Sequence, residues 1–237
     1  MVVLATKCYV AGDARERALD GMNALVDNAI GELDADWTLG VREDEFVQVD
    51  LSGGDATAAE NLLAEEWGEI PEEIVPGEEY VGTLEAWNEN GFTLDAGRRI
   101  EIPAAELGLG PGSPKQIVKR YGLVQHLPMR FVAGDPGAGT GSPGDNDDER
   151  TPHRVADAER DRLYDWTRGS GRVNVNSATR GEVRATVNRA GHARDIVTVE
   201  RLGLLEQSIV CAEDTDPPGL LAAIGEYLPA ELRCVVP

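Results

Sequence analysis

The chain has 237 residues, of which 43 are acidic and 22 are basic, and its formal net charge is −21. Only Lys7, Lys115 and Lys119 are lysines, and aromatic residues make up 5% of the chain. An acidic, lysine-poor composition is typical of proteins that work in concentrated salt, because surface carboxylates hold water and their repulsion is screened there. No apolar run approaches the roughly 18 residues of a membrane span, and the N-terminus lacks the flanks of a signal peptide. We therefore expect a halophilic, cytoplasmic protein with no membrane partner.

The cysteines and histidines do not form a chemical motif. Cys8, Cys211 and Cys234 lie in apolar, strand-like segments, so we expect buried, reduced thiols. The three histidines are scattered, without CxxC or HxxxH spacing, and we expect no metal site and no cofactor. Since no nucleophile and base can be paired from the sequence, we also expect no enzymatic activity and no catalytic residues.

Residues 1–77 form a strongly acidic segment with 18 acids and four bases. Their order of elements, βαββα, is most of a ferredoxin-like unit. Asp13 is the expected N-cap of the first helix. So acidic a face repels nucleic acid, and it offers a docking surface for a basic protein. The expected elements are strands over 2–10, 37–41 and 46–51 and helices over 13–33 and from about 55 to 67.

Residues 78–133 predict a small β-barrel. Short strands, tight turns and one helix before the last strand suit an OB-like fold. Asn88-Glu89-Asn90-Gly91 is a strong turn signal. Residues 134–152 are rich in Gly, Pro and Asp and predict a linker. The expected elements of the barrel are strands over 81–87, 92–96, 99–103 and 127–133 and a helix over 114–121.

Residues 153–237 predict a helix followed by a second ferredoxin-like unit of order βαββαβ. The first helix of that unit begins at Ser177 or Thr179, and Asp216 caps the second. The expected elements are helices over 155–167, from the Ser177 or Thr179 cap to 189, and from Asp216 to about 228, with strands over 172–175, 196–201, 206–211 and 232–236. The fold class is therefore α+β, a small OB-like barrel flanked by two ferredoxin-like units.

A basic island lies in this last segment, at residues 168–194, where six arginines face one acid, Glu182. Such a concentration in so acidic a chain indicates an anionic partner, because a planar guanidinium pairs well with phosphate. The alternative is that these arginines pair with acids elsewhere in the fold. Val183 and Val187 are four residues apart on one side of the helix, and we expect that side to face the sheet. The six arginines are Arg168, Arg172, Arg180, Arg184, Arg189 and Arg194.

The barrel segment GTLEAWNENGFTLDAG, residues 82–97, resembles the second and third strands of the S-one-type RNA-binding OB domain of ribosomal proteins. This resemblance implies that aromatic residues stack on bases while nearby cations contact phosphates. Phe92 falls on such an aromatic position and Trp87 lies close to it; the alternative is that both fill the barrel. The candidate cations are Arg98, Arg99 and Arg130 on the strands and Lys115, Lys119 and Arg120 on the short helix.

Three further segments resemble an archaeal family of proteins without an assigned activity, catalogued as domain of unknown function 2110. They are IVKRYGLVQHLPMRF (117–131), NVNSATRGEV (174–183) and RLGLLEQSIVC (201–211). This resemblance spans most of the chain. It implies an archaeal, cytoplasmic protein and supplies no site residues.

The segment TDPPGLLAAIGEYL, residues 215–228, resembles the Asp-x-Pro-Gly-Leu-Leu signature of amino-acid-binding ACT domains. It implies a small-ligand sensing module. In ACT domains the signature follows the first strand, whereas here it follows the third.

The function expected from the sequence is therefore non-catalytic binding of nucleic acid, with RNA or a ribonucleoprotein as partner, in archaeal transcription or translation. Two alternatives stay open. One is a protein adaptor that uses the acidic N-terminal face, and the other is an ACT-like sensor.

The composition makes one prediction about stability. Removal of salt by dialysis unfolds the protein, because unscreened carboxylates repel one another. Circular dichroism follows the loss of structure. An unchanged spectrum in dilute buffer contradicts the halophilic interpretation.

Overall fold

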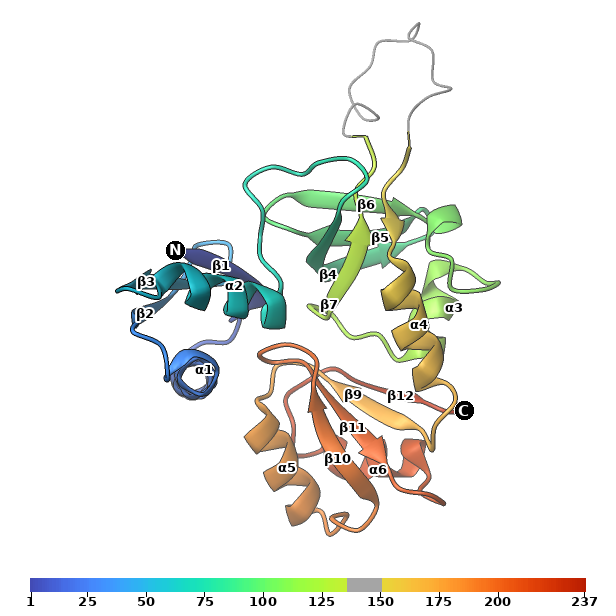
Figure 1. The fold of residues 1–237 in the computed structure, drawn as a ribbon. Helices are drawn as coiled ribbons and strands as arrows, with labels where there is room; N and C mark the ends of the chain where they lie inside the picture. The colour runs from blue at the N-terminus through green and yellow to red at the C-terminus, as the bar shows by residue number, and fades with distance from the viewer. Residues whose placement is uncertain (136–150) are drawn as a thin grey trace, which may run out of the picture.

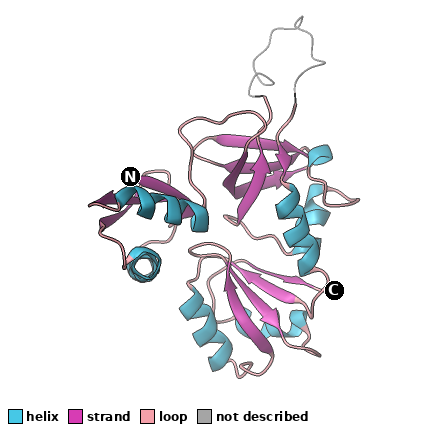
Figure 2. Ribbon diagram, viewed as in Figure 1, coloured by secondary structure: helices cyan, strands magenta, loops and turns pink. Residues whose placement is uncertain are grey.

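The structure, a computed structural model, describes residues 1–135 and 151–237. Within these residues the chain forms three lobes, each with an antiparallel sheet and its own apolar core (Figure 1). Figure 2 shows helices beside each of the sheets. The expected α+β class is confirmed at this level.

The N-terminal lobe is a three-stranded sheet of order β1-β3-β2 with two helices. Helix α1 starts one residue after Gly12, and Asp13 makes no capping hydrogen bond, so the expected N-cap was wrong. Residues 68–70 run antiparallel to the free edge of β1, where the Ile70 N–H donates to the Val3 carbonyl at 2.8 Å. The elements are β1 (Val2–Lys7), α1 (Asp13–Ile30), β2 (Asp36–Val41), β3 (Phe46–Ser52) and α2 (Ala56–Trp67).

The central lobe is a five-stranded sheet of order β6-β5-β4-β7-β8 that curls into a half-barrel. The predicted turn before β5 is present, and it needs glycine at its end. Gly91 has a φ of 148°, and a Cβ there would lie 1.9 Å from the Ile102 carbonyl oxygen. The elements are β4 (Glu79–Asn88), β5 (Gly91–Asp95), β6 (Arg99–Pro103), the 3-10 turn η1 (Ala104–Glu106), α3 (Pro114–Tyr121), β7 (Pro128–Val132), β8 (Arg154–Val155) and α4 (Asp157–Trp166).

The start of the expected C-terminal unit lies with the central lobe instead. Strand β8 pairs with β7, with Phe131 opposite Val155, and α4 packs on β7. Residues 136–150, most of the expected linker at 134–152, lie outside the described residues. Their two flanks are joined, since the Asp135 N–H donates to the Thr151 carbonyl at 2.9 Å.

The C-terminal lobe is a four-stranded antiparallel sheet of order β10-β11-β9-β12. Thr179 caps α5 in a reciprocal capping box with Glu182, and Asp216 caps α6 by accepting from the Gly219 N–H at 3.0 Å. Both expected caps are thus confirmed, with Thr179 rather than Ser177 as the first. The elements are β9 (Arg172–Val175), α5 (Arg180–Arg189), β10 (Ile196–Arg201), β11 (Gln207–Cys211), α6 (Pro217–Gly225) and β12 (Leu232–Val235).

The loop at residues 202–206, which joins β10 to β11, connects the N-terminal and C-terminal lobes. Leu204 and Leu205 are buried in the core of the N-terminal lobe. The Tyr9 O–H donates to Oε1 of the buried Glu206 at 2.6 Å, and the Ser177 N–H donates to the Tyr9 hydroxyl at 2.9 Å. One tyrosine of the N-terminal lobe therefore bonds to two segments of the C-terminal lobe.

A second polar contact joins the N-terminal lobe to the central lobe. Nζ of the buried Lys7 lies 3.0 Å from Glu85 and 2.8 Å from Asp95. The ring centres of Tyr9 and His126 are 4.0 Å apart. Nδ1 of His126 lies 3.3 Å from Oε1 of Glu85. Burial alone would raise the pKa of Glu85, but hydrogen bonds with His126, Thr83 and Lys7 outweigh it and lower the pKa to about 2.

Burial raises the pKa of Glu206 to about 8, against a value near 4.3 in an unfolded chain. Between these pH values the folded protein holds a proton that the unfolded chain has released. The free energy of unfolding therefore falls as the pH rises through this window, by up to about 5 kcal/mol.

Urea unfolding at pH 5.5 and pH 8 measures this slope, and Glu206→Gln removes most of it because the amide cannot ionise. Glu85 acts at another pH, since its stabilising contribution is lost only as the pH falls below about 4. A slope that is equally steep in Glu206→Gln contradicts the assignment.

Candidate nucleic-acid interface

A cleft with four arginines lies where α4 meets the C-terminal sheet. We call it the arginine cleft. Its volume is 560 Å³. The cations come from distant parts of the chain, because α4, β9, α5 and β10 each contribute one. The lining residues are Arg162, Asp165, Trp166, Arg172, Arg180, Thr198, Val199, Glu200, Arg201 and Leu202.

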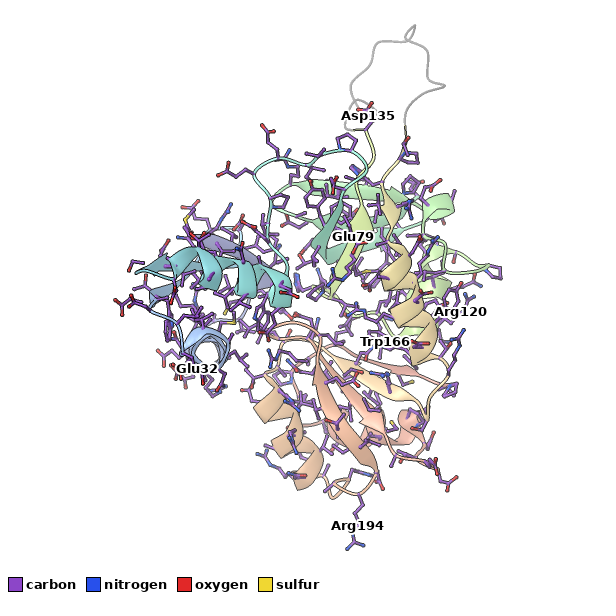
Figure 3. All side chains as sticks on the ribbon, viewed as in Figure 1. Glu32, Glu79, Arg120, Asp135, Trp166 and Arg194 are labelled. Atoms are coloured by element: carbon purple, nitrogen blue, oxygen red, sulfur yellow. The ribbon has the colours of Figure 1, made fainter. Side chains whose placement is uncertain are left out.

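Trp166 orders two of these arginines. The guanidinium carbon of Arg162 lies 5.2 Å from the indole ring, and that of Arg172 lies 5.5 Å from it. Both are within the range of cation–π attraction. Because only 3% of Trp166 is exposed, the indole holds the guanidinium groups in place and is not free to stack on a base. Figure 3 shows Trp166 on α4, directed toward the C-terminal lobe.

Acids partly neutralise the cleft. Arg172 pairs with Glu200 and lies 3.3 Å from the Ser208 hydroxyl. Arg162 pairs with the buried Glu159 and donates to the Pro128 carbonyl at 3.0 Å, yet its buried Nε has no partner.

The other two arginines are held less tightly. Nη1 of Arg201 lies 3.1 Å from Oε1 of Glu66. The guanidinium carbon of Arg201 also lies 5.1 Å from the centre of the Trp67 ring. Arg180 is exposed and donates only its Nε–H, to the Val199 carbonyl at 2.7 Å. Its terminal amino groups remain available to an anion.

The outward face of α5 continues the positive surface from Arg180. Val183 and Val187 are fully buried against the sheet, as the sequence predicted, so Arg184 faces solvent. Arg184, Arg189 and Arg194 are exposed, and none of their side chains has a hydrogen bond or ion pair within the described residues. Figure 3 shows Arg194 extending away from the lobe.

The six arginines of the basic island therefore divide into two groups. Arg168 and Arg172 pair with Asp165 and Glu200, as the alternative interpretation expected. Arg180, Arg184, Arg189 and Arg194 are exposed and have no acidic partner in the described part of the chain.

The candidate cations of the central lobe lie apart from the arginine cleft. Arg98 donates to the Glu72 carbonyl at 2.5 Å, and Arg99 pairs with Glu101 at 2.7 Å. Arg130 lies 3.4 Å from Glu79. Lys115, Lys119 and Arg120 project from α3, and Arg120 donates to the Leu109 carbonyl at 3.0 Å.

The two aromatic candidates do not form a stacking surface. Phe92 is 1% exposed and lies in the core of the central lobe, which removes it from the candidate binding residues. Trp87 is half-buried, and the guanidinium carbon of Arg233 lies 5.2 Å from its ring. The alternative that both residues fill the barrel is therefore correct for Phe92, whereas Trp87 is only partly buried.

Sequence reasoning missed Arg162, Trp166 and Arg201. A usable signal existed for the first two, because residues four apart on a helix share a face. Arg201 gave none, since only the folding of β10 beside α4 brings it to the cleft.

No helix in the described ranges combines the length and apolarity needed to cross a membrane. Those residues also contain no group of three His, Cys, Asp or Glu side chains that could hold a metal ion.

Three family models match the chain, and together they cover nearly all of it. The DUF2110 N-terminal domain matches residues 1–73, the DUF2110 central domain residues 74–167, and the DUF2110 C-terminal domain residues 170–236. The border at residue 167 agrees with the packing of β8 and α4 on the central lobe. A comparison with curated proteins found no match. The chain belongs to the DUF2110 family.

Burial predicts the effect of changing Phe92. Phe92→Ala lowers the free energy of unfolding by about 3–5 kcal/mol, because it leaves a cavity in the core. Denaturant unfolding measures the loss. If Phe92 were instead a surface stacking residue, the substitution would leave stability nearly unchanged and weaken only binding.

Proposed function

We propose that this DUF2110 protein is a non-catalytic nucleic-acid-binding protein whose partner is RNA or a ribonucleoprotein. The observation that carries the proposal is the arginine cleft, together with the unpaired arginines of α5 beside it. In a chain of net charge −21, a group of cations without acidic partners favours an anionic partner.

The arrangement of the arginines favours phosphate as the group that is bound. Guanidinium groups pair with phosphate in a bidentate geometry. Trp166 fixes Arg162 and Arg172 in advance, and each of these two also pairs with an acid, so Arg180 supplies the guanidinium group of the cleft that has no acidic partner in the described residues. Because no exposed aromatic residue lines the cleft, recognition by base stacking is not available there. A structured RNA, recognised by its backbone and shape, fits this chemistry better than a free single strand.

We also propose an OB-like fold for the central lobe and a ferredoxin-like fold for the C-terminal lobe. The meander β4-β5-β6, the helix α3 and the return through β7 to β8 support an OB-like central lobe. The strand order of the C-terminal lobe and its βαββαβ element order support a ferredoxin-like unit. Both folds occur among RNA-binding proteins.

The cellular setting is inferred from composition. The acidic, lysine-poor chain supports a halophilic archaeal cytoplasm, and with an RNA partner we propose transcription or translation as the setting.

An adaptor function has one observation in its favour. On α1, Asp13, Glu16, Asp20 and Asp27 have no ion-pair partner among the described residues. They leave a negative face that a basic protein could cover. Loss of co-purified proteins after neutralising this face, with RNA recovery unchanged, supports the adaptor.

The ACT-like alternative has less support. Asp216 and its two following prolines are accounted for by the start of α6. Thermal-shift measurements against amino acids and nucleotides test it directly.

RNA recovered by crosslinking from native high salt, followed by sequencing, tests the main proposal. Arg180→Glu/Arg184→Glu reduces recovery strongly, because it reverses two charges at the junction of the cleft and α5. In binding titrations of the recovered RNA, the slope of log K against log salt becomes shallower by about 1 to 2.

The matched control is Arg15→Glu/Arg42→Glu, which makes the same change of charge on exposed residues of the N-terminal lobe. Recovery that is absent in the unmodified protein, or equal in both double variants, rejects the proposal.

A further inference from the structure

A second cleft, with a different chemistry, lies between α3 of the central lobe and α6 and β12 of the C-terminal lobe. We call it the α3–β12 cleft. Its volume is 630 Å³, within the range of about 300–1,000 Å³ that holds small ligands. The lining residues are Gln116, Lys119, Arg120, Leu221, Leu232, Arg233, Cys234 and Val236.

One side of this cleft is apolar. Leu221 comes from α6, and Leu232 and Cys234 come from β12, which is an edge strand of its sheet. Val236 follows β12 and is 58% exposed. An apolar surface of this kind favours contact with an apolar ligand, because contact removes it from water.

The other side is cationic, and no acid is among the described residues that line the cleft. Arg120 is held by the carbonyls of Leu109 and Pro111, and Arg233 is held by Glu231 and the ring of Trp87. Lys119 is exposed and has no partner within the described residues. Two cations are thus fixed in advance, and the third is free to close on a ligand.

From this juxtaposition we propose that the α3–β12 cleft binds a small amphipathic anion. Its carboxylate or phosphate pairs with Lys119, Arg120 and Arg233, and its apolar body lies on Leu221, Leu232 and Val236. The inference does not depend on the proposed RNA binding, because none of these residues lines the arginine cleft.

The chemistry of the cleft selects among ligands. A free phosphate lacks the apolar body, and an apolar cation meets the positive charges of Lys119 and Arg120 beside the Arg233–Glu231 ion pair. A molecule with both an apolar body and an anionic head satisfies both sides. The same anionic chemistry is supplied by a fatty acid or by an alkyl phosphate.

Cys234 provides a direct readout. It is half-buried and lines the cleft, whereas Cys8 and Cys211 are buried. Burial raises the pKa of both buried thiols, to about 11 for Cys211, so they react slowly with alkylating reagents. Alkylation of Cys234 by iodoacetamide, followed peptide by peptide, therefore reports on the occupancy of this cleft.

The experiment compares decanoate and decyl phosphate, both below micelle formation, with inorganic phosphate and decyltrimethylammonium. At nine-tenths occupancy either anion slows the alkylation of Cys234 about tenfold, because only unoccupied protein reacts. The difference between the two anions identifies the preferred head group. Inorganic phosphate and the cation leave the rate unchanged.

Lys119→Glu and Val236→Asp abolish the protection, whereas Lys115→Glu, on the same helix but outside the cleft, retains it. Circular dichroism confirms that each variant is folded. No protection by either anion, equal protection by the cation, or full protection in both cleft variants overturns the inference.

Discussion

The structure depends on the burial of the loop between β10 and β11. Leu204 and Leu205 complete the core of the N-terminal lobe, although they are distant from it in sequence. Glu206 is fully buried beside them and accepts a hydrogen bond from Tyr9. A buried carboxyl group is tolerated only if it is neutral or well bonded. The raised pKa of Glu206 follows from this constraint, and so does the position of the C-terminal lobe.

That position decides which face of the C-terminal sheet is covered by the rest of the chain. Asn174 on β9 donates to the Gly122 carbonyl of the central lobe at 2.8 Å, and its cross-strand neighbour Arg233 reaches Trp87. This face of the C-terminal sheet is therefore directed at the central lobe. On this face Asn174 of β9 lies between Ser208 of β11 and Arg233 of β12, and Arg172 of β9 lies between Val210 and Val235. None of these residues is aromatic. The side chains named on this face therefore offer no ring for base stacking, and the two clefts described above lie at the rim of the sheet.

The local structure could be predicted from the sequence because its causes are local. The Thr179 cap, the buried Val183 and Val187, and the turn at Gly91 each follow from residues a few positions apart. The candidate site was found only in part. Arg172 and Arg180 were expected, and Arg162 and Arg201 were not, because the cleft forms from elements that meet only in the folded chain.

The wrong predictions have the same physical cause, because contacts between distant segments decided where these residues lie. Phe92 fits a surface aromatic position by sequence pattern, yet the curl of the sheet turns it into the core. Strand β8 has only two residues, too short for any periodicity, and its place is set by pairing with β7. The burial of Glu206 left no sign in so acidic a chain, because one more carboxylate carries no information there.

We propose that RNA is bound at the arginine cleft. Photo-crosslinking of the bound RNA, followed by mass spectrometry of the attached peptides, tests it most directly. We expect crosslinked peptides that contain Arg162 and Trp166 from α4 and Arg180 and Arg184 from α5. Crosslinks confined to β5 and β6 of the central lobe would contradict it.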